Sequence, residues 1–326
     1  MAHRRVLVYY AWSRPGEIGA PLDIIENRFP TLFESRRLGY PRYVELSDPS
    51  RFEQSVAGFL DHIMMRNFSA FVELASVWSS AAVVQVERVD DNGHLTALDA
   101  GMLEHIDTLI VISFDSLRTG QTAHDTEVNA VRQFLAHPDH LVFVCPHHDI
   151  GDVCNLPPDE WQPFQLASFQ HHGDKSIPPQ QGFGGFARSL LGGLDVPVQN
   201  RFGLRPAVEA NGSPAAIVVD VALDRLNLLD GVTTFNLHAH LPHLERQGNA
   251  VAKLDVLVRQ RIDMTAPPHP FTRERDTFDA LLQSRSGIFA GTLLVSDTTL
   301  WSSTAGGLDN LRRFWSNVVQ RPQAEL

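Results

Sequence analysis

Residues 107–149 read DTLIVISFDSLRTGQTAHDTEVNAVRQFLAHPDHLVFVCPHHD. The apolar runs 107–113 and 140–145 are typical of buried strands. Between them, residues 123–136 place apolar side chains at helical spacing. A strand, a helix and a second strand joined by short links predict a parallel pair with a right-handed crossover. This unit therefore predicts an α/β fold with a doubly wound, mainly parallel sheet that carries insertions.

The rest of the chain supplies more elements of the same kinds. Short apolar runs with β-branched residues predict strands at 5–11, 81–89, 215–223, 232–237, 250–262 and 291–296. Helical spacing and start signals predict helices after Pro21, after Asp48, and at 184–194 and 307–319. Residues from about 155 to 183 are rich in Pro, Gln and His, which predicts an irregular excursion. We expect one α/β domain over residues 1–326.

Composition and charge narrow the class of protein. The chain has 326 residues, 43% of them hydrophobic, and a formal net charge of −11. An acidic chain argues against a broad nucleic-acid interface, which needs a basic face. No apolar run is long enough to span a bilayer. Only Cys145 and Cys154 are cysteines, so a reducing, cytoplasmic setting is expected. We expect a small-molecule substrate, and the sequence leaves homo-oligomerisation open.

The first candidate site follows the strand at 140–145, because ligands of open α/β sheets bind beyond the carboxyl ends of parallel strands. Cys145 is a candidate nucleophile, although Pro146 restricts the residue before it to extended conformations, and a buried structural thiol is the alternative. His147, His148 and Asp149 can act as acids and bases or bind a metal. Imidazole and carboxylate ligands suit zinc or iron. The alternative is a polar turn.

A second candidate site lies in the segment FNLHAHLPHLE, residues 235–245. His238 and His240 are two residues apart and share one side of an extended chain, with His243 following. This H-x-H-x-x-H pattern predicts a metal site, and hydrogen-bonded histidines around a turn are the alternative. His171 and His172, in the Pro/Gln-rich excursion, form a third pair that could close over a pocket.

The unit 107–149 resembles the central part of class I glutamine-amidotransferase-like domains, above all the trehalose-utilisation-like (ThuA-like) branch. The closing segment GTLLVSDTTLWSSTAGGLDNLRRFWSNVV, residues 291–319, is similar to their last strand and helix. The resemblance covers about half of the chain. It implies a flavodoxin-like, amidotransferase-like sheet with a pocket at the ends of strands 107–113 and 140–145.

Two departures limit what this resemblance implies for activity. The family's Gly-x-Cys-x-Gly elbow is missing, since Phe143 and His147 stand where the glycines would be. Its late His-x-Glu pair has a counterpart in His243 and Glu245, just past the strand predicted at 232–237, which implies a base role for His243. Glutaminase activity is therefore not expected.

Two functions fit these observations. The first is an enzyme of hydrolase or lyase type that acts on a small polar molecule through His147, His148, Asp149 and Cys145. If the histidines at 238, 240 and 243 converge with them, a divalent metal, zinc or iron, would assist the reaction. The alternative is a non-catalytic ligand-binding or assembly protein that kept a degenerate amidotransferase-like scaffold, because a fold alone does not fix a function.

Overall fold

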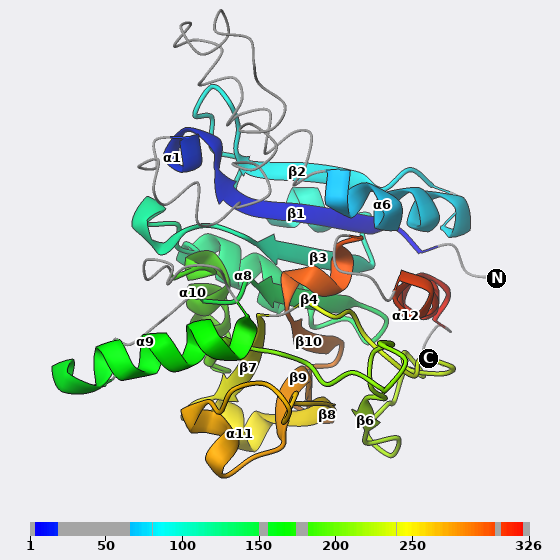
Figure 1. Ribbon diagram of the computed structural model, residues 1–326. Helices are drawn as coiled ribbons and strands as arrows, with labels where there is room; N and C mark the ends of the chain where they lie inside the picture. Colours follow the sequence, from blue (N-terminus) through cyan, green and yellow to red (C-terminus); the bar gives the residue numbers. More distant parts are fainter. Residues whose placement is uncertain are drawn as a thin grey trace, which may run out of the picture.

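A mixed eight-stranded sheet forms the centre of the molecule. The computed structural model describes residues 4–18, 66–79, 81–149, 156–173, 182–238, 240–303 and 308–321. The strands lie in the order β2 (Val84–Val89), β1 (Val6–Ser13), β3 (Thr108–Ser113), β4 (Leu141–Pro146), β10 (Thr292–Ser296), β9 (Thr277–Ser284), β8 (Leu254–Arg261) and β6 (Val218–Val219) (Figure 1). From β2 to β10 all neighbours are parallel, and from β10 to β6 they are antiparallel.

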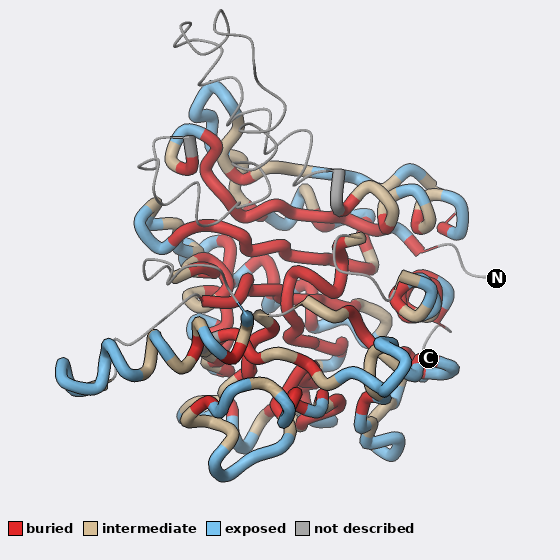
Figure 2. The backbone as a smooth tube through the Cα atoms, viewed as in Figure 1, coloured by how far each residue is buried: buried red, intermediate tan, exposed pale blue. Residues whose placement is uncertain are grey.

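The inner parallel strands are buried on both faces, whereas β2 at the edge of the sheet is partly exposed. Every residue of β1, β3, β4 and β10 is buried (Figure 2). Along β3, Ile110 and Ile112 belong to one apolar core, and Leu109 and Val111 belong to the other. Strands covered on both sides need unbroken apolar runs, and these four segments carry such runs in the sequence.

Helices pack on both sides of this sheet. One core contains Phe71 of α6 (Arg66–Trp78) and Phe314 of α12 (Leu308–Gln320). The opposite core contains Leu103 of α7 (Ala100–Leu103), Val131 of α8 (Asp125–Phe134) and Leu190 of α10 (Gly185–Gly193). The expected α/β architecture with a doubly wound, mainly parallel sheet is therefore confirmed.

The remaining elements lie at the periphery or at the strand ends. A small antiparallel sheet pairs β5 (Val198–Leu204) with β7 (Leu241–Arg246). Helices α1 (Arg14–Ile18), α9 (Pro158–His172) and α11 (Ala250–Lys253) and the 3-10 turns η2 (Leu117–Thr119), η3 (Pro270–Arg273) and η4 (Thr298–Trp301) complete the order. No helix in the described part of the chain is long and apolar enough to cross a membrane.

Several sequence predictions were wrong or incomplete. The excursion expected to be irregular contains the 15-residue helix α9, whose apolar residues do not gather on one face and which has Pro163 inside it. The run 232–237 forms no strand: Thr233 bonds to Asn310 of α12, Asn236 bonds to η4, and one backbone bond joins Ile217, just before β6, to Thr233. Only Val218–Val219 pairs within 215–223. The helices expected after Pro21 and Asp48 lie outside the described residues.

Candidate metal centre

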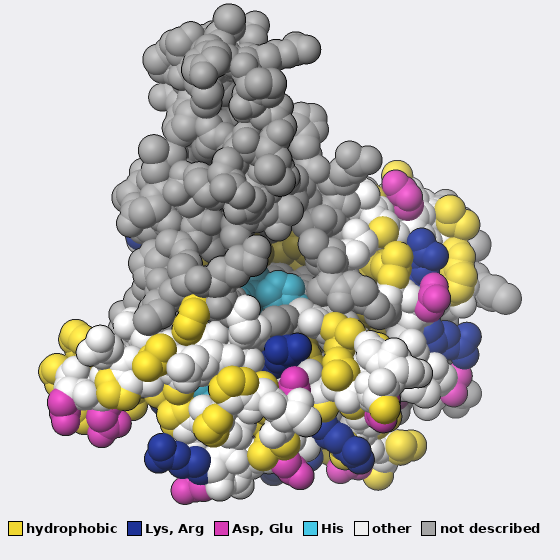
Figure 3. Space-filling model, in the orientation of Figure 1, with side chains coloured by type: hydrophobic (Ala, Val, Ile, Leu, Met, Phe, Trp, Pro, Cys, Tyr) yellow, Lys and Arg dark blue, Asp and Glu magenta, His cyan; other side chains and the backbone are white. Residues whose placement is uncertain are grey.

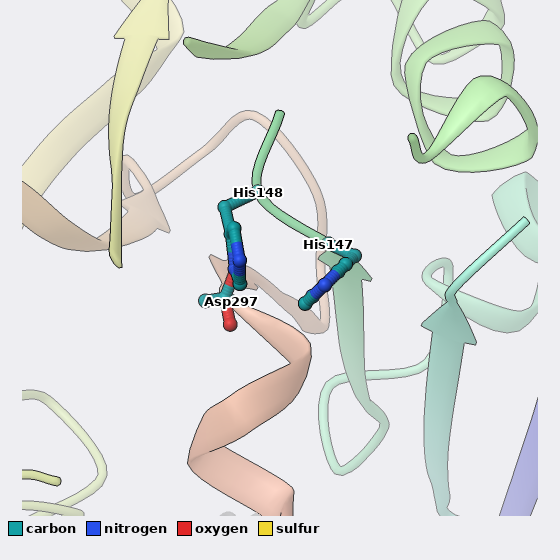
Figure 4. Close-up of side chains that lie close together, drawn as sticks. All are labelled: His147, His148 and Asp297. Atoms are coloured by element: carbon teal, nitrogen blue, oxygen red, sulfur yellow. The ribbon is translucent and has the colours of Figure 1, made fainter. Parts of the chain in front are cut away.

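Two loops meet at the carboxyl edge of the parallel sheet. His147 and His148 directly follow β4, and Asp297 directly follows β10. These strands are parallel neighbours, with Val144 opposite Val295, so both loops leave the sheet at the same edge. Figure 4 shows the three side chains close together above the strand ends. The segment predicted as a site is thus joined by a carboxylate that follows β10, a strand whose register partners in β4 lie 151 residues earlier in the chain.

His147, His148 and Asp297 form a group that could hold a metal ion. One ligand atom from each residue lies within 4.8 Å of the other two. Nδ1 of His148 is 3.8 Å from Oδ2 of Asp297. All three side chains are buried, with exposed fractions of 6%, 2% and 3%. Two imidazoles and one carboxylate are a ligand set found in zinc and non-haem iron sites that keep further positions open.

The two oxygens of the Asp297 carboxylate differ in their hydrogen bonding. Its Oδ1 accepts a 2.8 Å hydrogen bond from the backbone N–H of Thr299, which caps η4. Its Oδ2 is buried and has no hydrogen-bond partner among the described residues. Burial raises the pKa of Asp297 to about 6, although the bonds from Thr299 oppose this shift. A buried carboxylate oxygen without a partner is costly, and a cation would compensate it.

His147 is fixed from several sides. Its Nδ1 lies 3.1 Å from Oγ1 of Thr298, and its ring stacks on Phe114 with 4.0 Å between centroids. Its backbone N–H donates to Ser113, and its carbonyl accepts a hydrogen bond from the side-chain amide of Asn200. Contacts of this kind on one ring nitrogen fix the orientation of metal-binding histidines.

Two more histidines extend the group. The rings of His238 and His240 lie 4.8 Å and 5.6 Å from the ring of His148. Burial, together with the nearby His148 and His240, lowers the pKa of His238 well below its usual 6.5. The ring of His172 lies 4.2 Å from that of His240. All three predicted histidine pairs therefore come together in space.

His243 does not join them. Sequence reasoning placed it beyond a strand end, but it lies within β7, where Nδ1 accepts a 3.2 Å hydrogen bond from the backbone N–H of Asp279. Its ring packs against Phe271. Burial, with a smaller effect of nearby arginines, lowers its pKa to about 4. The structure therefore separates His243 from the His238 and His240 pair with which it was expected to bind a metal.

Cys145 and Asp149 also have other partners. The Cys145 side chain lies in the apolar core, where its Sγ accepts a hydrogen bond from Nε1 of Trp301, and burial raises the thiol pKa to about 12. Asp149 pairs with Arg188 and accepts a hydrogen bond from the backbone N–H of Phe183. Neither contact supports the nucleophilic or acid–base roles expected from the sequence. Cys154 lies outside the described residues.

Sequence reasoning missed two residues of this region. Asp297 directly follows the strand predicted at 291–296, so the rule that singled out Cys145 would also have found it. Asn236 is fully buried: its amide donates a 2.8 Å bond to the carbonyl of Thr299, and its oxygen accepts one from the backbone N–H of His238. It therefore ties the His238 loop to the turn that holds Asp297.

Part of the histidine group reaches the surface. His238 and His240 are only partly buried. In Figure 3, histidine side chains are visible at the centre of the face shown.

Comparison of the chain with protein-family models and with curated proteins gave no match. The resemblance to amidotransferase-like domains therefore stays a prediction, while the α/β fold and the buried His147, His148 and Asp297 group are features of the structure itself.

Proposed function

We propose that the protein is a metal-dependent enzyme of hydrolase or lyase type that acts on a small polar molecule. The metal ligands in this proposal are His147, His148 and Asp297. The observation that carries it is the buried Oδ2 of Asp297, which has no hydrogen-bond partner among the described residues and lies 3.8 Å from an imidazole nitrogen. Zinc or iron fits this ligand set.

A divalent cation at this position supplies Lewis-acid chemistry. The chain supplies a hydrogen-bond donor beside it. Nδ1 of His238 accepts a 3.3 Å hydrogen bond from the backbone N–H of His240, so the neutral ring carries its proton on Nε2. The lowered pKa of His238 keeps that ring neutral near pH 7. We therefore assign to His238 the role of donating a hydrogen bond from its neutral Nε2–H to a substrate oxygen.

The alternative is a ligand-binding or assembly protein on a degenerate amidotransferase-like scaffold. The observation that favours it is the state of Cys145, because a buried thiol with a pKa near 12 cannot serve as the nucleophile of that family. The two proposals differ in what the metal centre does. The enzyme proposal requires both metal binding and turnover of a substrate by the loaded protein.

Metal analysis of protein purified without a His tag tests the proposal. We expect one zinc or iron per chain, or uptake of one Zn²⁺ or Fe²⁺ after treatment with a chelator. Asp297→Asn should abolish this uptake. The matched control is Asp224→Asn, which changes a carboxylate that caps the backbone N–H groups of Leu228 and Leu229 away from the site.

Failure to bind Zn²⁺ or Fe²⁺, or equal binding by Asp297→Asn, would reject the metal centre. The loaded protein should also hydrolyse or cleave at least one compound in a panel of small esters, amides and hydroxy acids. Stoichiometric metal without any turnover would favour the non-catalytic alternative.

A further inference from the structure

Helix α9 is attached to the rest of the described structure near its C-terminal end. It spans Pro158–His172, and its buried residues, Ser168 and His171, both lie in its last two turns. Its first six residues are exposed, and Trp161 is 43% exposed. Figures 1 and 2 show the exposed end projecting away from the sheet. Phe164, in the middle of the helix, also packs against the apolar core and contacts the His269 ring, so the contacts of α9 with the core in the described structure lie from Phe164 onward.

The first anchor, His171, requires a neutral ring. Its Nδ1 lies 3.1 Å from the carbonyl oxygen of Pro267, which can only accept, so Nδ1 carries the proton. Its Nε2 accepts a 3.2 Å hydrogen bond from the backbone N–H of Arg205. A second proton on this ring would place two N–H groups against each other and remove the bond to Arg205.

The second anchor, His269, lies on the segment that contacts α9 and also requires a neutral ring. Its Nδ1 accepts a 3.2 Å hydrogen bond from the backbone N–H of Phe271, so the neutral ring carries its proton on Nε2. That Nε2 lies 3.1 Å from Oγ of Ser168 on α9. Both nitrogens of His171 and of His269 are thus engaged by protein groups, and neither ring serves as a further metal ligand.

The charged groups around the two anchors do not cancel the effect of burial on the pKa of either ring. Asp263 and Arg205 act on His171 in opposite directions, and they pair with each other at 3.3 Å. His171 and His172 lower the pKa of His269 further. Burial is the main cause of the lowered pKa of both rings, and the pKa of His269 falls to about 3. Both anchors therefore favour the neutral form.

We propose that α9 is a pH-sensitive latch, docked while His171 and His269 are neutral and released when they are protonated. His172 belongs to the same end of the helix: its Nε2 donates to the carbonyl of Gly203, and its ring contacts His240 beside the candidate metal centre. Release of α9 withdraws His172 from His240. This consequence for the site rests on the proposed function, whereas the release itself does not.

The direction and size of the effect follow from proton linkage. A histidine whose pKa is lowered on docking stabilises the docked state above the usual pKa of 6.5 and loses that contribution as the pH falls below it. For a shift from 6.5 to about 3, the docking equilibrium weakens roughly thirtyfold between pH 7.5 and pH 5 through His269 alone. His171 acts in the same direction.

Hydrogen–deuterium exchange of the full, metal-free chain tests this latch. Protection factors corrected for intrinsic exchange are compared at pH 7.5 and pH 5 for peptides from α9 and from α12. We expect protection in the last two turns of α9 to fall at least tenfold, on the order expected from linkage, with α12 unchanged. Equal loss in both helices, or no loss in α9, would overturn the proposal.

Variants separate the latch from general acid sensitivity. The double change His171→Gln and His269→Gln removes the titrating groups and should make α9 protection independent of pH. His140→Gln is the matched control: this partly buried ring also has a lowered pKa, but its bond is to Phe134. It should leave the α9 profile unchanged.

Ser168→Ala covers the case in which the double variant does not fold. It removes the hydroxyl that meets His269 without changing a histidine. We expect lower protection of α9 already at pH 7.5, and wild-type protection at that pH would contradict the latch. Because every measurement uses metal-free protein, failure of the latch and failure of the metal proposal remain distinguishable.

Discussion

Two histidine pairs in the described structure show how differently the same side chain can be used. In the first pair, Nδ1 of His148 lies 3.8 Å from a buried carboxylate oxygen, beside His147. In the second pair, His171 and His269, all four ring nitrogens contact backbone groups or a hydroxyl. The first arrangement suits a cation, and the second suits a neutral ring that holds two segments together. The partners of the ring nitrogens, and not the spacing of the histidines, decide the role.

The largest expected effect comes from replacing one histidine of each pair by glutamine. His148→Gln removes a ligand and should weaken Zn²⁺ affinity by at least about 100-fold, with little change in melting temperature. His171→Gln should do the reverse: unchanged affinity and weaker attachment of α9. Competition titration with a chromophoric chelator and calorimetry check both. Equal metal affinities in the two variants would remove the distinction between the pairs.

His243 provides a third setting, a buried ring inside a strand. With its pKa lowered to about 4, His243 stabilises the folded state above pH 6.5 and loses that contribution as the pH falls toward 4. Relative to His243→Gln, the wild type should lose about 1.4 kcal/mol of unfolding free energy per pH unit over this window. Urea unfolding at several pH values measures this difference. Parallel pH profiles of the two proteins would contradict it.

Asn236 tests whether the metal centre depends on its support. Asn236→Leu removes the bond from the His238 loop to the carbonyl of Thr299, in the turn that holds Asp297, and the bond within the loop from the backbone N–H of His238. Loss of such supporting contacts typically costs about 10- to 100-fold in metal affinity, and we expect a loss in this range. Asn317→Leu is the control, since Asn317 also bridges backbone carbonyls, those of Leu228 and Asp230, away from the site. Equal affinity losses would indicate a general packing effect.

The smallest effect is expected at Cys145. Cys145→Ala should leave metal affinity unchanged and lower the unfolding free energy by about 1–2 kcal/mol, through a small cavity and the lost acceptor for Trp301. Iodoacetamide at neutral pH should not label this thiol in the folded protein, as resolved by peptide mass spectrometry. Rapid labelling of the native chain would show that Cys145 is a reactive thiol and a candidate nucleophile.

The parallel half of the sheet could be predicted from the sequence because its signal is local. Strands β3, β4 and β10 are unbroken apolar runs, and α8 and α12 carry clear apolar faces. Helix α9 has no such face and contains a proline, so composition suggested an irregular segment. The run 232–237 has the composition of a strand, but its polar groups meet side chains of α12 and backbone of η4.

The position of the candidate site could be predicted from the sequence, but only some of the residues that form it could. The rule that ligands lie beyond parallel strand ends indicated His147 and His148, and it applies equally to Asp297. That Asp149 would pair with Arg188, and that His243 would lie inside β7, depended on contacts between segments far apart in the chain. Periodicity along one segment carries no information about such contacts.

The pairing of β4 with β10 also affects when the site comes into existence during folding. Leu141 and Thr292 are register partners, and the residues that meet at this edge are 151 positions apart in the chain. Contacts of such long sequence separation carry a large loop-closure entropy and form slowly compared with local ones. His147 and Asp297 therefore come together only after the last strand has docked. A bound ion would stabilise the completed fold selectively, so metal uptake during refolding would report the final step of assembly.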